Sequence, residues 1–443
     1  MRILHYSLGF PPYRTGGLTK FCVDLMEEQV KEGHEVSLLW PGEMQIFGKE
    51  TKIRKHDQIN GIGNYEVINP TPIPFDEGIK DFFAFKNPGN AEVYESFLKN
   101  VNPDVIHIHT LMGLHKCLLD VANRNEIRLV FTTHDFFPIC PKVTMFRHGK
   151  ICESFESCEE CGTCNSTALS LRKIRILQSP LYRNFKNTAI VKKLRKQHRD
   201  VYLGDDSDRN ENGVVGTPLN YKDLRAHYQE MLSMMDVIHY NSSVTKSVYE
   251  QVFNMKNSVL IPITHSNVVD NKKRKTFNGN QIRIRYLGPQ GRNKGFYLLK
   301  AALDKLWKES HNFCLDIHFI PVESSPYMRT HDRYSYSELE TIFNETDVLI
   351  APSICYETFG YTVLEALSFG VPVIISGTVG AKDILANGAG IVINDIDMDG
   401  IYSTLRTVNA DKLNAMNEVI VSCQHIQTIK EMSDEIEQKV YHS

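Results

Sequence analysis

Short apolar runs alternate with longer segments in which apolar residues recur at helical spacing. In the first half, strand-like runs occupy residues 2–7 (RILHYS), 34–40 (HEVSLLW), 104–110 (DVIHIHT) and 128–134 (RLVFTTH). Between the first two, the segment LTKFCVDLMEEQVKEG carries a helical apolar stripe and ends at a glycine, as many helices do. Strand–helix–strand order with strongly apolar strands predicts a parallel sheet covered by helices on both faces.

The second half repeats this order. Strand-like runs lie at 282–288, 315–320, 347–353 and 371–376, with helix-like segments between them. We therefore predict an α/β protein of two Rossmann-like, doubly wound parallel-sheet domains that face each other across a cleft. Because ligands bind beyond the carboxyl ends of the strands in such sheets, the cleft is the expected nucleotide site.

The predicted domains are bounded where this alternation changes. Residues 1–275 form the first domain, with an insertion at about 140–235 in which the strand–helix order is lost. The linker DNKKRKTFNGN is polar and turn-rich, and it leads into the second domain, residues 276–425. We expect residues 426–443 to form a C-terminal helix that packs back across the domains.

Composition and charge exclude several classes of protein. The chain has 443 residues, more than one hydrophobic core usually serves, and 42% of them are hydrophobic. A formal net charge of −3 gives no general basis for nucleic-acid binding. No stretch reaches the roughly 18 apolar residues of a membrane span, and the N-terminus lacks the pattern of a signal peptide. We therefore expect a cytoplasmic protein whose ten cysteines are reduced.

The segment CYETFGYTVLEALSFGVPVI, residues 355–374, contains the clearest candidate chemistry. Glu357 lies in the loop after a predicted strand, and Glu365 lies on the helix that follows. At the start of that helix, the N–H groups of Gly360, Tyr361 and Thr362 are free to bind a phosphate. Carboxylates accept hydrogen bonds from hydroxyl groups, so one glutamate on each side of the phosphates describes a nucleotide sugar.

These motifs resemble the retaining glycosyltransferases of the GT-B fold, in the GT4-like group. ETFGYTVLEALSFGVPVI is similar to the signature of that family, and the resemblance extends to GGLTKFCVDL, PDVIHIHT, YLGPQGRNKGF and DVLIAPS. It implies that Glu357 contacts hydroxyls of the transferred sugar and that Glu365 contacts the ribose. It also implies retention of anomeric configuration by a front-face route, in which the leaving phosphate helps to deprotonate the acceptor.

Two glycine-containing loops complete the predicted donor site. Gly16 and Gly17 follow the first strand and let backbone amides approach the donor phosphates. In YLGPQGRNKGF, cations would stabilise the charge that grows on the departing nucleoside diphosphate. By resemblance, Lys294 matches the family lysine, whereas Pro289 stands where the family has an arginine. Arg292 is the candidate replacement for that arginine.

The first domain supplies the expected acceptor side. His134 comes directly after a predicted strand, and the resemblance implies a histidine here that helps to position donor and acceptor. On the preceding strand, His109 is expected to reach the cleft and His107 to be structural. Asp135 is a further candidate for contact with the acceptor.

Two other polar segments are weaker candidates. The loop VGAKDIL, with Gly380, Lys382 and Asp383, resembles a family loop and could hold the donor sugar or its phosphates. The run DDSD at 205–208 imitates a metal-binding motif, but the resemblance implies no need for it. We expect catalysis to require no cofactor.

Five cysteines crowd the insertion: Cys140, Cys152, Cys158, Cys161 and Cys164. Two overlapping C-x2-C pairs share Cys161, and four thiolates would suit a structural zinc ion, for which the last four are the candidates. Unliganded thiols explain the spacing equally well, and a disulfide or an iron–sulfur cluster is a third alternative.

Residues 171–199 are rich in lysine and arginine, contain no acidic residue and have apolar residues interleaved. This pattern is typical of a basic amphipathic helix on an anionic membrane, although a solvated helix or a protein-binding surface would look similar. It places the expected protein in the cytoplasm, peripheral to the inner face of the membrane.

The combined prediction is a retaining transferase that moves a sugar from a nucleotide sugar to a growing, lipid-linked cell-surface glycan. The alternatives are a transferase for a small soluble acceptor and a catalytically silent scaffold with the same fold. A dinucleotide-dependent dehydrogenase is excluded, because no G-x-G-x-x-G follows the first strand.

Overall fold

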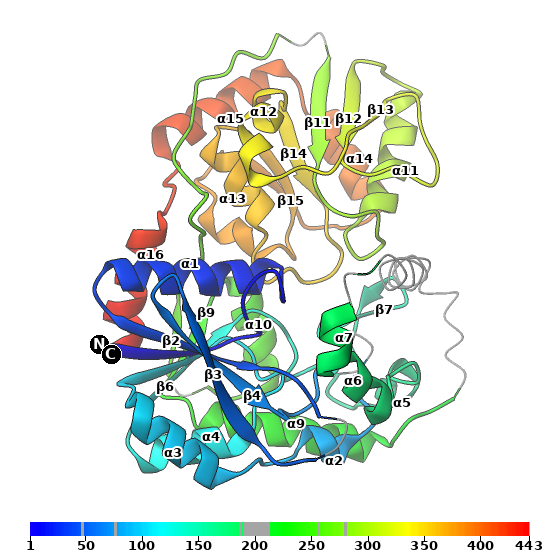
Figure 1. Cartoon of the computed structure of the whole chain (residues 1–443). Coiled ribbons are helices and arrows are strands. Elements are labelled where there is room, and N and C mark those ends of the chain that lie inside the picture. Colours follow the sequence, from blue (N-terminus) through cyan, green and yellow to red (C-terminus); the bar gives the residue numbers. More distant parts are fainter. Residues whose placement is uncertain are drawn as a thin grey trace.

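The computed structural model shows two α/β domains, one built on each parallel sheet, stacked along the long axis of the molecule (Figure 1). It describes residues 1–45, 48–74, 78–153, 155–185, 188, 213–255, 257–278 and 281–442. The predicted α/β class and the two doubly wound sheets are confirmed.

The first sheet has eight strands in the order β10-β9-β6-β5-β1-β2-β4-β3. Seven of them are parallel, and β3 at the edge runs antiparallel to β4. The strands are β1 (Arg2–Tyr6), β2 (Glu35–Pro41), β3 (Lys52–Ile59), β4 (Ile62–Ile68), β5 (Val105–Ile108), β6 (Arg128–Thr133), β9 (Val237–Tyr240) and β10 (Ser258–Leu260).

The β3–β4 hairpin is an element that the sequence analysis missed. Its turn is Asn60-Gly61, and both residues have positive φ, which is the strongest short-range signal for a hairpin. β3 is largely exposed and carries several charges, as suits a strand that must not pair with another chain.

Helices cover both faces of the first sheet because alternate strand residues supply an apolar surface to each side. One face packs on α3, α4, α9 and α10, and the other on α1 and α16 (Figure 1). The first-domain helices are α1 (Gly17–Lys31), α2 (Phe82–Phe85), α3 (Ala91–Val101), α4 (Lys116–Arg124), α9 (Pro218–Ser233) and α10 (Ser243–Val252).

The second sheet has six strands, all parallel, in the order β13-β12-β11-β14-β15-β16. They are β11 (Ile282–Tyr286), β12 (Phe313–Ile317), β13 (Met328–Thr330), β14 (Val348–Ala351), β15 (Val373–Ser376) and β16 (Gly390–Ile393). The helices of this domain are α11 (Phe296–Trp307), η2 (Tyr336–Glu338), α12 (Leu339–Asn344), α13 (Tyr361–Ser368), η3 (Gly380–Ile384), α14 (Met398–Arg406) and α15 (Ala410–Cys423).

The insertion lies beside the first sheet and contains only short elements. They are β7 (Phe146–Arg147), β8 (Lys150–Ile151), α5 (Cys161–Cys164), α6 (Leu171–Leu177) and α7 (Pro180–Phe185). Of the predicted basic segment, residues 186–187 and 189–199 lie outside the described residues, as does the DDSD run at 205–208. Within the described part of the chain, every helix is too short or too polar to span a bilayer.

After α15, the chain returns from the second domain to the first. Helix α16 (Ile429–Ile436) and the π-helical turn η4 (Glu437–Tyr441) pack on α1, β6 and β9 (Figure 1). One continuous apolar cluster therefore joins Phe21 of α1, Phe359 and Val379 of the second domain, and Met432 of α16. This shared core joins the two domains.

Candidate active site

Three helices begin where the carboxyl ends of the two sheets meet. Helices α1, α11 and α13 start after Gly16, Gly295 and Gly360, and no side chain caps any of them. Eight other helices of the described chain have a side-chain cap, whereas α4, α5 and α12 also lack one. Uncapped helix starts leave N–H groups, at the positive end of the helix dipole, available to an anion.

The two domains touch at this point through the predicted motifs. A Cβ added to Gly17 would lie 3.4 Å from the ring of Tyr361. The Thr358 hydroxyl donates to the backbone carbonyl of His134 at 3.3 Å, and Ser242 Oγ donates to the carbonyl of Thr358 at 2.6 Å. Gly17 and His134 of the first domain therefore face the glutamate motif of the second.

Lys294 and Glu357 form an ion pair between two loops of the second domain. Lys294 Nζ lies 3.0 Å from Glu357 Oε1, and Ser353 donates a hydrogen bond to the same carboxylate oxygen. Burial raises the pKa of Glu357, but the charge of Lys294 and the Ser353 hydrogen bond outweigh it and hold the pKa below its usual value. Side-chain exposures of 29% and 21% leave the pair accessible to a ligand.

The loop before Lys294 is fixed by its backbone. The carbonyl of Asn293 accepts hydrogen bonds from the N–H groups of Ile354 and Cys355, which ties this loop to the glutamate loop. Arg292 lies exposed on the same loop. Pro289 stands at the position of the family arginine, and its carbonyl accepts a hydrogen bond from the hydroxyl of Tyr286. The structure thus brings Lys294 to Glu357, whereas Arg292 is exposed.

Glu365 lies in a buried aromatic pocket rather than on the surface. His265 Nε2 lies 3.1 Å from Glu365 Oε1, and the His265 ring packs against Tyr361 at 4.9 Å between centroids. Burial and the nearby Glu365 charge raise the pKa of Tyr336 to about 12. Among the described residues, no hydrogen bond reaches Nδ1 of His265 or the hydroxyl of Tyr361. These two groups are unsatisfied polar atoms beside the carboxylate.

His134 is half-buried at the end of β6, with its ring 4.6 Å from that of Phe21. Burial lowers the pKa of His134 to about 3, so the ring is neutral at physiological pH. His109 does not reach the seam as expected: it is fully buried behind His134, with its Nδ1 3.3 Å from His134 Nε2. The strand alternation that aligns His109 with His107 directs both onto the covered face of the sheet.

Asp135 serves the loop that follows β6. Its carboxylate accepts hydrogen bonds from the Thr110 hydroxyl and the Phe137 N–H, both at 2.9 Å. The carbonyl of Asp135 accepts a hydrogen bond from the hydroxyl of Tyr249 at 2.7 Å. These bonds position the His134 loop, which differs from the acceptor contact that the sequence suggested.

The loop at 380–384 holds the domains together. Asp383 accepts hydrogen bonds from both the backbone N–H and the hydroxyl of Ser243, at the start of α10 in the first domain. Lys382 Nζ donates to the carbonyl of Gly377 at 2.9 Å. Both side chains therefore have protein partners, and the loop acts in the structure as an interdomain contact.

The cysteines of the insertion gather only in part. Cys140, Cys152, Cys161 and Cys164 line one pocket, whereas the predicted fourth ligand, Cys158, donates from its thiol to the carbonyl of Phe155. Across the described chain, no disulfide forms, and the groups of metal-ligating atoms within 4.8 Å of one another do not include three of these sulfurs. The donor set suits zinc, but the sulfurs would have to move closer to coordinate it.

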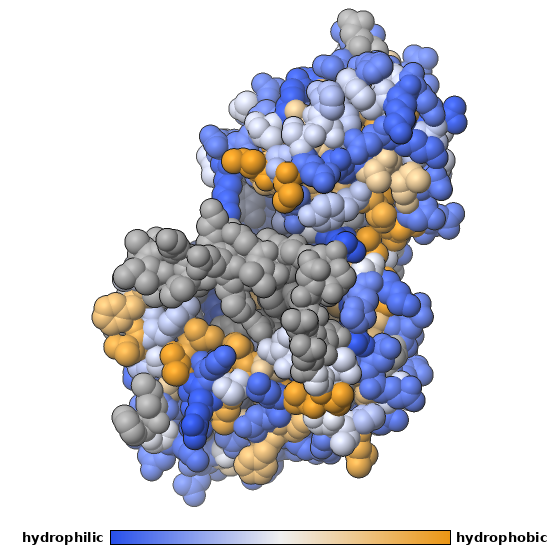
Figure 2. Space-filling model, turned by 90° about the vertical axis from the view of Figure 1, so that its right-hand side faces the viewer, coloured by the Kyte–Doolittle hydropathy of each residue, from blue (hydrophilic) through white to orange (hydrophobic). Residues whose placement is uncertain are grey.

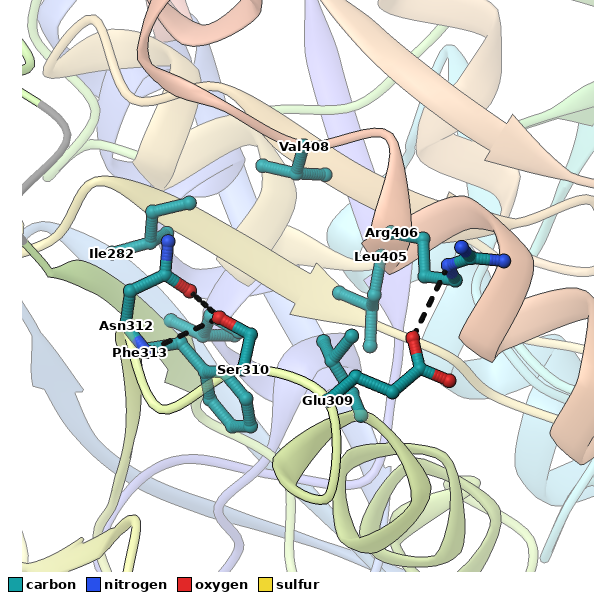
Figure 3. A pocket seen from close by; sticks show the side chains of 10 residues that line it. Ile282, Glu309, Ser310, Asn312, Phe313, Leu405, Arg406 and Val408 are labelled. Atoms are coloured by element: carbon teal, nitrogen blue, oxygen red, sulfur yellow. Dashed lines mark hydrogen bonds and ion pairs between the residues drawn. The ribbon is translucent and has the colours of Figure 1, made fainter.

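Another pocket lies in the second domain, at the end of its sheet opposite to Lys294 and Glu357 (Figure 3). It is lined by residues at the amino ends of β11 and β12, including Ile282 and Phe313, and by the Glu309–Arg406 ion pair. Ligands of open parallel sheets bind at the carboxyl ends of the strands. This pocket is therefore not part of the candidate active site.

Several residues that shape the site were missed by the sequence analysis. Ser353 and His265 contact the two glutamates, and a set of buried polar residues extends behind His134. The alternation in the run VIHIH at 105–109 was a signal that two histidines share one face of a strand. The others come from strands and helices far apart in the sequence: His5, Gln29, Thr132, His239 and Tyr441.

Known sequences resemble this chain in both of its halves. The chain matches Glycosyltransferase Family 4 over residues 15–157 and Glycosyl transferases group 1 over residues 329–420. It is also 21% identical, over 86% of each chain, to a protein of Klebsiella pneumoniae described as an uncharacterized 42.6 kDa protein in the cps region.

Solved structures share the fold over almost the whole chain. A sucrose-phosphate synthase from Thermosynechococcus elongatus superposes with a TM-score of 0.59 at 13% identity, covering 98% of this chain and 97% of the other. WaaG, a glycosyltransferase involved in lipopolysaccharide biosynthesis, gives 0.54 at 13% identity and covers 99% of each chain. HepE of Anabaena, in complex with UDP and glucose, gives 0.54 at 12% identity over 99% and 98%. Family matches in both halves, on a fold of two facing parallel sheets, identify the chain as a GT4-like glycosyltransferase of the GT-B fold.

Proposed function

We propose that this glycosyltransferase transfers a sugar, with retention of configuration, from a nucleotide sugar to a hydroxyl group of a growing lipid-linked glycan. The observation that carries the proposal is the Lys294–Glu357 pair beside three uncapped helix starts. That combination offers a cation and several N–H groups to a diphosphate, and a carboxylate to the hydroxyls of the attached sugar.

Lys294 supplies the charge that the leaving group requires. As the bond between sugar and phosphate breaks, negative charge grows on the nucleoside diphosphate, and a cation placed beforehand stabilises that state more than the ground state. Glu357 holds the ammonium group of Lys294 in place until the diphosphate arrives. The proposal assigns no step to a metal ion, because Lys294 and the N-termini of α1 and α13 perform this role.

Glu357 and Glu365 bind opposite ends of the donor. Glu357 accepts hydrogen bonds from the sugar hydroxyls, and Glu365 accepts them from the ribose. The unsatisfied Nδ1 of His265 and the hydroxyl of Tyr361 lie beside Glu365 and would gain a partner when the nucleotide binds. Two of the structural neighbours, HepE and a trehalose-6-phosphate enzyme from E. coli, are described with UDP and UDP-2-fluoro glucose. This favours a UDP-sugar as the donor to test first.

A thermal-shift panel tests donor binding. Wild type, Glu365→Gln and the surface control Glu340→Gln are each mixed with UDP-, GDP- and ADP-sugars and the free diphosphates. A ligand at 100 times its dissociation constant stabilises by about 2.7 kcal/mol, which is readily detected. We expect one base to stabilise wild type and Glu340→Gln but not Glu365→Gln. No shift with any nucleotide at millimolar concentration contradicts the proposal and favours the silent-scaffold alternative.

Retention of configuration needs a separate test. The anomeric configuration of the new glycosidic linkage is read by proton NMR, with the donor found in the panel. Retention supports a front-face route in which the leaving phosphate helps to take the acceptor proton. An inverted product contradicts it.

The acceptor assignment rests on the surface of the insertion. The side chains of Ile176, Leu181 and Phe185 on α6 and α7 are each more than half exposed, and Arg172 and Lys173 are exposed beside them. Figure 2 shows this face of the molecule, on which hydrophobic patches lie between hydrophilic ones. Apolar side chains flanked by cations suit an anionic membrane surface, where lipid-linked acceptors are found.

We therefore place the enzyme on the inner face of the membrane. Sedimentation with anionic and neutral vesicles tests this, with Ile176→Ser/Leu181→Ser/Phe185→Ser as the variant and Phe83→Ser as an exposed apolar control. Binding of wild type and the control to anionic vesicles, lost in the triple variant, supports the proposal. Equal behaviour of all three proteins favours a small soluble acceptor.

The structural zinc ion stays a prediction with a simple test. Metal analysis of protein purified without chelators should find one zinc per chain, and Cys161→Ser should lose it. The absence of stoichiometric zinc would leave the cysteines as thiols.

A further inference from the structure

A continuous chain of hydrogen bonds runs from His134 into the core of the first domain. Eight consecutive bonds, of 2.6 to 3.3 Å, join five histidines with one glutamine, one tyrosine and one threonine, and they end at a backbone carbonyl. We call it the histidine relay; its members are, in order, His134, His109, His5, Gln29, Tyr441, His107, Thr132, His239 and the carbonyl of Ile261.

Sheet geometry assembles most of the relay. His5 of β1 is the register partner of His107 of β5, and Thr132 of β6 is that of His239 of β9. Alternation places all four on the face that α1 and α16 cover, and Tyr441 of η4 approaches from that side. The relay therefore joins the site to the C-terminal segment.

The far end of the relay has only one allowed polarity. His239 Nε2 lies 2.8 Å from the carbonyl oxygen of Ile261, which can only accept, so the proton is on Nε2. A neutral imidazole carries one ring proton, so His239 Nδ1 must accept its bond from the Thr132 hydroxyl at 2.9 Å.

That polarity passes along the next two members. The Thr132 hydroxyl donates its one proton to His239. In its contact with His107 Nε2, at 2.6 Å, the Thr132 oxygen must therefore accept the hydrogen bond. His107 Nδ1 then has no proton and accepts from the hydroxyl of Tyr441 at 2.7 Å. Tyr441 of η4 links His107 of the sheet to Gln29 of α1, so the same hydrogen-bond direction continues from the sheet to the helices that cover it.

The remaining members follow in the same sense. The oxygen of Tyr441 accepts from Gln29 Nε2 at 3.1 Å, and Gln29 Oε1 accepts from His5 Nε2 at 2.8 Å. His5 Nδ1 accepts from His109 Nε2 at 2.9 Å, and His109 Nδ1 accepts from His134 Nε2 at 3.3 Å. The amide orientation of Gln29 agrees with the direction set independently at Ile261.

Burial keeps every histidine of the relay neutral, so that each ring carries only one proton. It lowers the pKa of His5 and His239 to about 4, and it holds the pKa values of His107 and His109 well below their usual value. His5, His107 and His109 also have nitrogens close enough together to suggest a metal site. However, each of their ring nitrogens already has a hydrogen-bond partner within the relay.

We propose that Tyr441 and Thr132 are positioning residues that fix His134 as the tautomer protonated on Nε2. The Nδ1 atom, to which no described residue makes a hydrogen bond, is then always an acceptor for a substrate hydroxyl. The tautomer assignment concerns the free protein, whereas its use with a sugar hydroxyl rests on the function proposed above. A histidine free to exchange tautomers would present a donor part of the time.

Imidazole nitrogen NMR of the full-length protein labelled with ¹⁵N-histidine tests the assignment directly. The signals of His134 are identified as those lost in His134→Gln. The comparison is between wild type, Tyr441→Phe and Tyr94→Phe. Tyr94 is a matched control, because its buried hydroxyl also bonds a buried histidine of the first domain, His115, outside the relay.

We expect a single tautomer of His134 in wild type and Tyr94→Phe, protonated on Nε2. Tyr441→Phe should give both tautomers or the Nδ1-protonated one. A wild-type proton on Nδ1, or the same His134 spectrum in folded Tyr441→Phe as in wild type, overturns the proposal. Binding of a stoichiometric metal ion to His5, His107 and His109 in wild type overturns it as well.

A second pair of variants serves if Tyr441→Phe does not fold. Thr132→Val removes the hydroxyl with little change of shape and separates the relay from its anchor at Ile261. Thr132→Ser keeps the hydroxyl and should keep the wild-type tautomer of His134. Equal tautomer ratios in these two variants overturn the proposal.

Ligand binding separates the relay from the proposed function. Loss of one hydrogen bond to the sugar should weaken UDP-glucose binding to Tyr441→Phe by roughly threefold to tenfold and leave UDP binding unchanged. Equal weakening of both ligands contradicts a role at the sugar. Failure of wild type to bind either ligand contradicts the proposed UDP-sugar donor but leaves the NMR result on the tautomer standing.

Discussion

The two halves of the site meet at the same seam but work by different electrostatics. The first domain contributes neutral histidines, whose hydrogen bonds run in one direction from His134 to the sheet interior. The second domain contributes full charges, with Lys294 and Glu357 3.0 Å apart. Burial explains the difference: the histidines lie behind the sheet edge, whereas the ion pair keeps contact with solvent.

This difference determines which substitutions each half tolerates. A charge pair depends on the sign of its charges and much less on which atom carries a proton. A neutral hydrogen-bond chain depends on every donor and acceptor in it, and each of its histidines must stay without a second proton.

Lowering the pH should reduce the stability of the first domain before that of the second. An unfolded histidine binds a proton below about pH 6.5, whereas the buried histidines resist protonation until about pH 4, so stability falls as pH drops through this window. Each such histidine removes about 1.4 kcal/mol per pH unit. With five of them, several kcal/mol should be lost by pH 5.5. The low pKa of Glu357 protects the second domain there.

The two tryptophans allow this to be measured, since Trp40 lies in the first domain and Trp307 in the second. Urea unfolding of Trp40→Phe and Trp307→Phe at pH 7.5, 6.5 and 5.5 follows each domain separately. Stability of the first domain that does not change with pH would count against neutral buried histidines.

Removing the charge of Glu357 should have the largest effect on catalysis. Glu357→Gln keeps the shape of the side chain but leaves Lys294 without its counter-charge and weakens the contact with sugar hydroxyls. We expect kcat to fall by roughly 100- to 1000-fold, as for other groups that stabilise a transition state. Glu309→Gln, at the far end of the same domain, should retain wild-type kcat.

Lys294→Met tests the cation itself and should lower kcat by about 100-fold. Without Lys294, burial dominates and the pKa of Glu357 rises, so the acidic limb of the pH–rate profile should move to higher pH. Arg292→Met should cost much less, since Arg292 is exposed and Lys294 is the cation paired with Glu357. A larger loss in Arg292→Met than in Lys294→Met would reverse the two assignments.

Asp383→Asn should have the smallest effect. The ionised side chain accepts two hydrogen bonds at the start of α10, and its replacement by an amide should cost about 1 kcal/mol. Urea unfolding followed through Trp40 measures the loss in the first domain. Ser243→Ala removes the hydroxyl bond but keeps the backbone N–H bond to Asp383, so Asp383→Asn should still lower stability in that background, by less than in wild type.

Much of the architecture could be predicted from local patterns. The alternation of strands and helices predicted four strands of each sheet, and ETFGYTVLEAL placed Glu357 in a loop and Glu365 on the next helix. These features depend on neighbours in the sequence. The β3–β4 hairpin also had a local signal, in Asn60-Gly61, that was overlooked.

The parts that could not be predicted depend on residues brought together by the sheet. His109 was expected at the seam because sequence alternation gives the face of a strand but not what covers it. Asp383 resembled a donor-binding residue, yet its partner lies 140 positions earlier in α10. Tyr441 carried no signal, because its role depends on the return of α16 to the first domain.

The Asp383 contact makes helix α10 a natural reporter of domain opening. The backbone amide of Ser243 is in the first domain, but its hydrogen-bond acceptor belongs to the second. Whenever the domains separate, that amide becomes accessible to solvent while the rest of the first domain stays folded. Hydrogen–deuterium exchange at the first turn of α10 should therefore measure how often the enzyme opens, and a bound donor that holds the domains together should slow it.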